Sequence, residues 1–303
     1  MLSLQCEVFL LLLTGYILDK KGMLTDSTRD QLTDIVIDII LPCSIVKSFE
    51  MELSAEVLLS TAQILLAAVG IQIFYWILNR FLYRSFSEDE QIACKYSTMV
   101  TNASFIGMPI ASELYGPMGL LYSSIFVLPQ RIFMWAYGLP MYTTVRKQDI
   151  VRKVVTHPCV FSIFLGIGVM ILYSNGVVLP DAVSNTLAAL GNCTTALCLL
   201  IIGSILSDLK PAEMICKRAL LYSFYRLLLI PLVLAVVLRF LPFDDLSRHI
   251  CVLMSAMPAP TTAVILAQKY DRDPKFASKL MVASTLLSLV TLPVITAAMN
   301  FMG

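Results

Sequence analysis

Charged residues are scarce in this sequence of 303 residues, because Asp, Glu, Lys and Arg together make up only 14%. A soluble domain averages about 25%. Histidine occurs only twice, and the eight cysteines are scattered singly, without a CxxC pair. These absences argue against a metal site or a disulfide framework. The sequence also lacks a basic, aromatic-interleaved patch for nucleic acid and a nucleophile–base pair or phosphate loop for an enzyme, and nothing in it predicts a cofactor.

Hydrophobic residues are abundant at 58% of the chain, and they gather in long runs. A membrane-spanning helix needs about 20 mostly apolar residues. The sequence predicts an all-α integral membrane protein with ten such helices and short connections in a lipid bilayer. The predicted helices cover residues 2–18, 31–49, 57–80, 95–114, 119–144, 156–174, 184–206, 215–240, 248–268 and 277–301.

The basic residues alternate between the loops that join these helices. The odd-numbered loops hold almost all of them, whereas the even-numbered loops contain little besides Arg239 and Arg248. Lysine and arginine favour the cytoplasmic side of a membrane. We therefore expect a multi-pass protein of the plasma (inner) membrane with both termini outside.

The chain divides into two halves of five helices, and an odd helix number gives the halves opposite orientations. The sequence predicts a first inverted repeat at 1–145, a cytoplasmic connecting loop at 146–154 and a second repeat at 155–303. Weak sequence echoes support the repeat. Asp26 and Asp181 are separated by the same 155 residues that separate Tyr115-Gly116 from Tyr270-Asp271.

Helices 4 and 9 hold helix-breaking residues at matching places in the two halves, Gly107 and Pro109 in helix 4 and Pro258 and Pro260 in helix 9. Proline removes a backbone donor, and paired broken helices near the midplane are typical of secondary transporters. Half-helix N-termini there would suit an anion, although ordinary proline kinks are the alternative. The candidate substrate-binding residues are Asn102, Ser104, Gly107 and Pro109 in helix 4, with Pro258, Pro260, Thr261 and Thr262 in helix 9.

Several polar residues fall inside the apolar runs, where a charge costs about 2.5–3.5 kcal/mol at the helix centre. Arg131 is a further candidate for substrate binding. Both Arg131 and Arg226 could bind a carboxylate substrate or pair with Asp38 or Asp34. Asp38 is a weak candidate for proton or ion coupling. Asn192 and Thr194 in helix 7 either coordinate an ion or make interhelical hydrogen bonds. No role for Lys47 follows from the sequence.

Five stretches resemble the auxin efflux carrier family over essentially the whole chain. They are Leu41-Pro42, Asn102 to Pro109, His157 to Phe161, Met257 to Tyr270 and Leu286 to Pro293. The short central loop is similar to that of bacterial members, which resemble permeases for malate or malonate. The bile acid/sodium symporters are related to this family.

The resemblance implies two inverted repeats, with helices 1, 2, 6 and 7 as a scaffold and helices 3–5 and 8–10 as the moving part of an elevator. It implies transport of a small organic anion, with Asn102 contacting the substrate, and a homodimer. The second repeat has no matching asparagine, which argues against auxin itself.

The sequence therefore predicts a secondary active transporter of an organic anion such as a carboxylate, with a proton or sodium as a possible coupling ion. The alternatives are a sodium-coupled symporter and a transporter-like ligand sensor, and a channel would differ by non-saturating flux.

Overall fold

The computed structural model describes residues 2–143, 152, 154–207 and 216–302. Across these ranges the chain forms helices and turns without a β-strand, as the composition predicts. Most of the predicted connecting loop at 146–154 lies outside the described residues.

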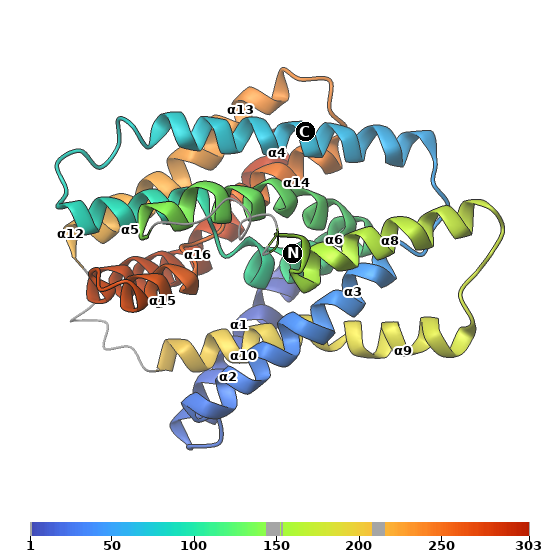
Figure 1. Ribbon diagram of the computed structural model, residues 1–303, viewed down its shortest axis with the longest axis horizontal. Helices are drawn as coiled ribbons and strands as arrows, with labels where there is room; N and C mark the ends of the chain where they lie inside the picture. Colours follow the sequence, from blue (N-terminus) through green and yellow to red (C-terminus); the bar gives the residue numbers. More distant parts are fainter. Residues whose placement is uncertain (1, 144–151, 153, 208–215, 303) are drawn as a thin grey trace. The chain divides into compact units, whose positions relative to one another are not determined.

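The observed helices overlap the predicted apolar runs (Figure 1), although α5 begins well before residue 95 and the predicted helices 95–114 and 248–268 are each interrupted. The first half holds α1 (Leu2–Lys20), α2 (Asp26–Ile35), α3 (Leu41–Ser48), α4 (Ala55–Leu78), α5 (Glu88–Met99) and α6 (Met108–Phe133). The second half holds α8 (Pro158–Ser174), α9 (Asp181–Gly191), α10 (Cys193–Ser207), α12 (Lys217–Phe224), α13 (Ile230–Arg239), α14 (Asp245–Ser255), α15 (Thr261–Lys269) and α16 (Pro274–Met302).

Several runs contain short π-helical segments, and each of these ends two residues before a proline. The segments are η1 (Val36–Ile40), η2 (Ala103–Gly107), η3 (Met134–Gly138) and η5 (Tyr225–Leu229), and the prolines are Pro42, Pro109, Pro140 and Pro231. Proline has no N–H, and its ring clashes with the carbonyl four residues earlier. A wider π turn moves that carbonyl away, so the chain continues as a helix instead of ending.

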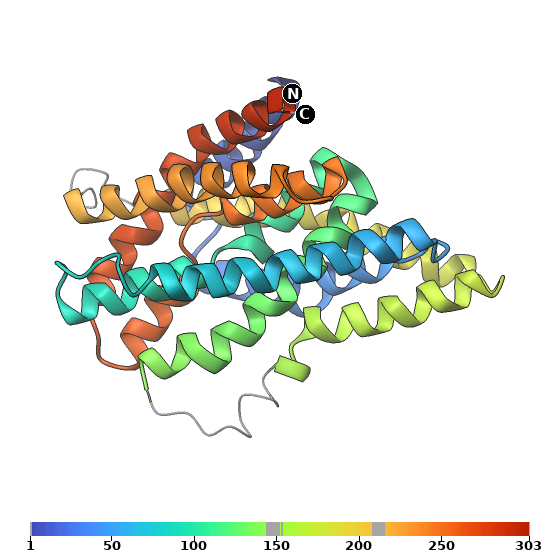
Figure 2. The ribbon, with the colours of Figure 1, turned by 90° about the horizontal axis from the view of Figure 1, so that it is seen from above.

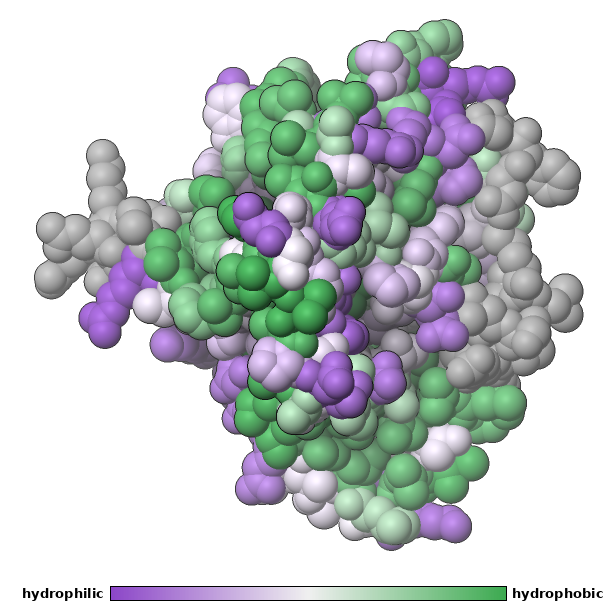
Figure 3. Space-filling model, turned by 90° about the vertical axis from the view of Figure 1, so that its right-hand side faces the viewer, coloured by the Kyte–Doolittle hydropathy of each residue, from purple (hydrophilic) through white to green (hydrophobic). Residues whose placement is uncertain are grey.

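Long apolar helices place many hydrophobic side chains on the surface. Within the described ranges, four helices are long and apolar enough to cross a membrane by length and composition, namely Ala55–Leu78, Asp181–Ile205, Lys217–Arg239 and Pro274–Met299. The first of these is an uninterrupted helix (Figure 2). Leu66 is 72% exposed and Val290 is 66% exposed, and hydrophobic residues cover much of the face in Figure 3. Such surfaces are rare on soluble proteins and indicate a multi-pass membrane protein.

The chain packs as two compact units. The first comprises Met1–Leu58, Met108–Ser124 and Val155–Leu209, and the second comprises Leu59–Gly107, Ile125–Val154 and Lys210–Gly303. This division groups helices 1, 2, 6 and 7 together, as the family resemblance implies. The stretch Met108–Ser124 departs from that expectation, because it packs with the first unit and not with the rest of helices 4 and 5.

Gly116 explains why this stretch can turn away from its neighbours. It lies inside α6 with φ 63° and ψ −154°, so Met108 to Tyr115 and the residues after Gly116 form two separate helices. Only glycine adopts this conformation without strain. Asp271, 155 residues later in the chain, also has a positive φ of 56°.

In the first unit, α1 and α10 lie side by side and approach closely at two glycines (Figure 1). A β-carbon on Gly15 would overlap the carbonyl of Leu200, and one on Gly203 would overlap the carbonyl of Leu12. Small residues allow this close approach between membrane helices, where packing rather than water exclusion holds helices together.

Lys47 belongs to a polar cluster at the end of α3. Its Nζ donates to Glu50 Oε2 and to Ser184 Oγ, each at 2.6 Å. Ser184 Oγ and Tyr173 OH also donate to Glu50 Oε2, at 2.6 and 3.1 Å. Burial raises the pKa of the Glu50 carboxyl, but the hydrogen bonds from Lys47 and Ser184 more than offset this and hold the pKa below its ordinary value. Lys47 therefore forms a structural ion pair with Glu50 within the first unit.

We expect Gly203→Ala to lower stability by about 1–3 kcal/mol, because the new methyl group must push α1 and α10 apart. The matched control is Gly168→Ala in α8, where a β-carbon meets nothing within 4 Å. That change should be neutral or stabilising by about 0.5–1 kcal/mol. Melting temperatures of the purified variants in detergent check this, and equal values for the two would contradict the packing described.

The Glu50 cluster predicts a specific loss of stability in acid. A carboxyl whose pKa is depressed in the folded state stabilises it above the ordinary pKa of 4.5. This contribution is lost as the pH falls through the folded-state pKa. Melting temperature should therefore fall less steeply below pH 4.5 in Glu50→Gln than in the parent protein. Glu52→Gln, at an exposed neighbour, is the control and should retain the parent slope.

Candidate functional site

The fourth predicted helix, residues 95–114, is interrupted in the second unit between α5 and η2. Val100 is extended, with φ −110° and ψ 116°, and the helix resumes at Ala103. Gln130 clamps the break, because its Nε2 donates to the Thr101 carbonyl at 2.9 Å and its Oε1 accepts from Thr101 Oγ1 at 3.1 Å. These bonds satisfy backbone and hydroxyl groups that the missing turn would otherwise leave unpaired.

The ninth predicted helix, residues 248–268, is interrupted in the same unit between α14 and α15. Residues 256–260 there are buried and lie outside the helices. The Asn102 N–H donates to the Pro258 carbonyl at 2.9 Å, which joins the two breaks directly. Ser284 Oγ accepts the Ala259 N–H at 3.0 Å and donates to the Leu280 carbonyl at 2.7 Å in α16. Both interruptions are therefore fixed by defined hydrogen bonds.

Two candidate residues meet beside the first break. The Arg131 guanidinium donates through Nη2 to Ser104 Oγ at 2.8 Å. Ser104 is buried, and Arg131 is half-buried. The Asn102 side chain is also half-buried, and among the described residues it makes no hydrogen bond. A cationic group, a hydroxyl and an amide thus lie on neighbouring parts of the interrupted helix.

The other candidates of the second unit surround the breaks. Gly107 allows close approach, since a β-carbon there would lie 2.9 Å from Met254 Sδ and 3.0 Å from Met257 Cγ. Pro260 precedes α15, so Thr261 and Thr262 occupy its first turn. Thr262 Oγ1 lies 3.0 Å from Tyr96 OH, within hydrogen-bonding distance.

Arg226 is placed apart from these contacts as a structural residue of the second unit. It is 1% exposed, its Nη1 donates to Tyr75 OH at 3.1 Å, and its guanidinium lies 4.8 Å from the centre of that ring. A cation over an aromatic face is stabilised even without an anion.

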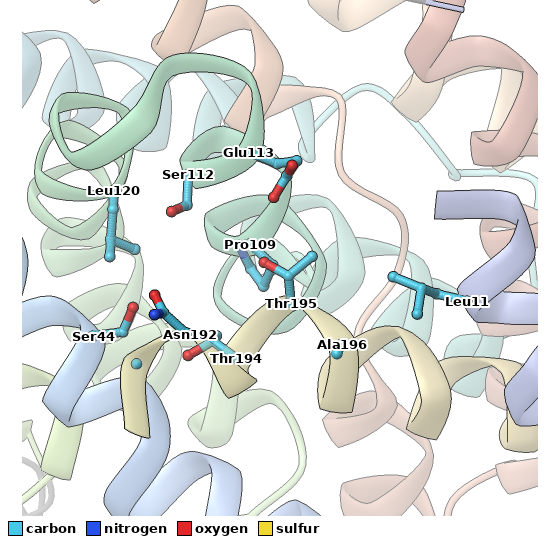
Figure 4. A pocket seen from close by; sticks show the side chains of 11 residues that line it. Leu11, Ser44, Pro109, Ser112, Glu113, Leu120, Asn192, Thr194, Thr195 and Ala196 are labelled. Carbon is cyan, nitrogen blue, oxygen red and sulfur yellow. The ribbon is translucent and has the colours of Figure 1, made fainter. Parts of the chain in front are cut away.

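The first unit contains a cavity of about 290 Å³. Its polar lining comes from α3, from the helix before Gly116 and from the interruption between α9 and α10 (Figure 4). The lining residues are Leu11, Ser44, Pro109, Ser112, Glu113, Leu120, Gly191, Asn192, Thr194, Thr195 and Ala196. Three predicted residues, Pro109, Asn192 and Thr194, therefore face one space, whereas Asp38 is exposed and outside this lining.

Several residues of these two regions were not predicted from the sequence. Gln130, Tyr96 and Ser284 hold the breaks through tertiary contacts, and no local pattern marks such partners. Glu113 carried a usable signal, because it is a carboxylate four residues after Pro109 in a predicted membrane helix.

Comparison with known proteins agrees with the sequence and the fold. A family model described as membrane transport protein matches residues 4–296, which confirms the resemblance to the auxin efflux carrier family. An uncharacterized transporter of Methanothermobacter thermautotrophicus is 26% identical over 294 residues, covering 95% of this chain and 94% of that relative. An uncharacterized transporter of Methanocaldococcus jannaschii is 20% identical over 293 residues, with 94% of each chain covered.

The hydrogen bond to the second break predicts a difference between two serines of α16. Ser284→Ala leaves the buried Ala259 N–H without its partner and should lower stability by about 1–3 kcal/mol. Ser288→Ala is the matched control, because this buried hydroxyl donates only within its own helix, to the Thr285 carbonyl at 2.7 Å. Thermal unfolding of both variants provides the measurement. An equal loss in the two would show that Ser284 does not fix the break.

Proposed function

Because this chain belongs to the membrane transport protein family, we propose that it is a secondary carrier of a small organic anion such as a carboxylate. The family establishes a transporter and argues against an enzyme. The substrate class is inferred from the chemistry beside the interrupted helices.

The observation on which this proposal rests is the arrangement at the first break. Arg131 keeps its charge at any physiological pH, and its planar guanidinium suits a carboxylate. Its bond to Ser104 Oγ holds it beside the break, while the Asn102 amide is without a hydrogen-bond partner among the described residues. A carboxylate could accept from the guanidinium and from the amide at once.

The second break adds positive electrostatic potential. The first N–H groups of a helix lack partners within it, and the helix dipole is positive at that end. Thr261 and Thr262 at the start of α15 would supply such N–H groups and two hydroxyls. Gly107, Pro258 and Pro260 would shape the breaks so that backbone can approach the substrate.

We further propose that the chain consists of ten membrane-spanning helices in two inverted repeats, at 1–145 and 155–303. Matched backbone features support this. Gly22 and Gly176, after α1 and α8, both have positive φ, at 71° and 75°, as do Gly116 and Asp271. The loop charges favour both termini outside the plasma membrane.

The proposed transport cycle is elevator-type alternating access. The unit that contains the two breaks would be the moving part, and the other unit would be the scaffold, in a homodimer. A sodium-coupled symporter is the second candidate, favoured by the carboxylate of Glu113 in the cavity of the first unit. A ligand sensor would bind the same anion without moving it.

Thermal stability in the presence of small carboxylates tests the proposal. A ligand that binds only the folded protein raises its melting temperature by mass action. We expect mono- or dicarboxylates to do so, and Asn102→Ala to weaken the effect. This variant removes the amide but retains the backbone N–H that donates to Pro258.

Asn175→Ala, at an exposed amide that donates to the Ile171 carbonyl, is the control and should respond like the parent protein. Arg131→Met should abolish the carboxylate response. If every carboxylate leaves the melting temperature of the parent protein unchanged, or if Asn102→Ala and Arg131→Met respond fully, the anion site is elsewhere or absent.

A further inference from the structure

The cavity of the first unit is chemically different from the region around the breaks. Its side chains supply hydroxyl, amide and carboxylate oxygens, from Ser44, Ser112, Glu113, Asn192, Thr194 and Thr195. Among the residues that the structure describes, no Lys, Arg or His lines it. Figure 4 shows Ser112 and Glu113 on one side of the cavity and Asn192 and Thr194 on the other. Such a lining repels an anion and suits a cation.

The Thr194 hydroxyl is buried and available to coordinate an ion. The residue is 4% exposed, and its Oγ1 has no hydrogen-bond partner among the described residues. Several other helical hydroxyls of this unit donate to a carbonyl four residues earlier, as Thr186 does to Ala182 at 2.7 Å. Thr194 is the second residue of α10, directly after the interruption at Asn192, and it makes no such bond. A buried hydroxyl usually has a bonding partner, so we expect the partner of Thr194 Oγ1 to occupy the cavity.

Glu113 provides the negative charge of this cavity. Within the described ranges it forms no ion pair and no hydrogen bond. Glu113 and Asn192 are both exposed, so an ion can reach them from the open side of the cavity. The balance is one negative charge among neutral oxygens.

This balance selects the class of cation. Calcium sites in proteins gather several carboxylates, and magnesium is held by carboxylates with waters in a rigid octahedron. Transition metals prefer histidine or cysteine ligands, and neither is among the described residues of the lining. A single carboxylate with hydroxyl and amide oxygens matches a hard cation of charge +1. We propose that this cavity binds Na⁺, with Glu113 as its charged ligand and Thr194, Asn192 and Ser112 as neutral ligands.

The ion would be bound by the unit that does not contain the breaks. Binding of Na⁺ is a property of this cavity and does not depend on the transported substrate. That this Na⁺ is the coupling ion of the carrier rests on the proposed function. The test is therefore made without any organic anion.

The experiment titrates NaCl into the full-length purified protein, with choline chloride keeping the ionic strength constant, and follows the melting temperature. We expect Na⁺ to raise it saturably. In Glu113→Gln the apparent affinity should fall by about tenfold or more, because a charge-assisted contact is lost. Thr194→Val keeps the side-chain shape and should weaken binding without removing the carboxylate, which provides a second readout if Glu113→Gln folds poorly.

Glu52→Gln is the control, because it removes an exposed carboxylate of the same unit that does not line the cavity, and it should bind Na⁺ as the parent does. A parent protein whose melting temperature does not depend on Na⁺ would overturn the proposal, as would an unchanged affinity in both cavity variants. A response to pH that requires Glu113 but is indifferent to Na⁺ would assign a proton to the cavity and would also overturn the sodium assignment.

Discussion

The hydrogen bond from the Asn102 N–H to the Pro258 carbonyl joins the two places where the membrane helices are broken. Lipid offers no partner for a backbone group, so each break must be satisfied by protein or by a wet cavity. Gln130 and Ser284 complete this requirement on either side, through the Thr101 carbonyl and the Ala259 N–H. The breaks can therefore persist inside an apolar protein, and their side chains can face a ligand.

Proline accounts for much of the remaining irregularity. Each π-helical segment ends two residues before a proline, as η1 does before Pro42 and η5 before Pro231. A wide turn absorbs the missing donor where the helix continues, whereas helix 9 separates completely at Met257 to Pro260. The difference arises because Pro258 and Pro260 stand within three residues, which leaves too few backbone N–H donors for a π turn.

The sequence predicted the helices well because apolar runs are local and long. It also located the breaks, since glycine and proline act on the residues beside them. It did not predict Ser284, Gln130 or Tyr96, which are distant in the chain from the groups they bond. The packing of Met108 to Ser124 with the first unit was likewise missed, because it depends on the backbone reversal at Gly116 and on tertiary contacts. The sequence therefore predicted the positions of the helix breaks, which proline and glycine determine locally. It did not predict the side chains that bond to those breaks from distant parts of the chain.

Two opposite chemistries are thus separated within one chain. Arg131, Ser104 and the interrupted helices form a region suited to an anion, and Glu113 with Thr194 lines a cavity suited to a cation. A carrier that couples an anion to a cation would need both units. This separation is the physical reason for keeping a sodium-coupled symporter as the second candidate function.

The central claim is that the protein moves an organic anion by alternating access. Purified protein reconstituted into liposomes that contain unlabelled carboxylate, with the labelled carboxylate outside, measures this directly. We expect saturable uptake that is faster when the unlabelled compound is inside, because the carrier can then return with its site occupied instead of empty. Flux that rises linearly without saturation would indicate a channel, and binding without any flux would indicate a sensor, and either result would contradict the account.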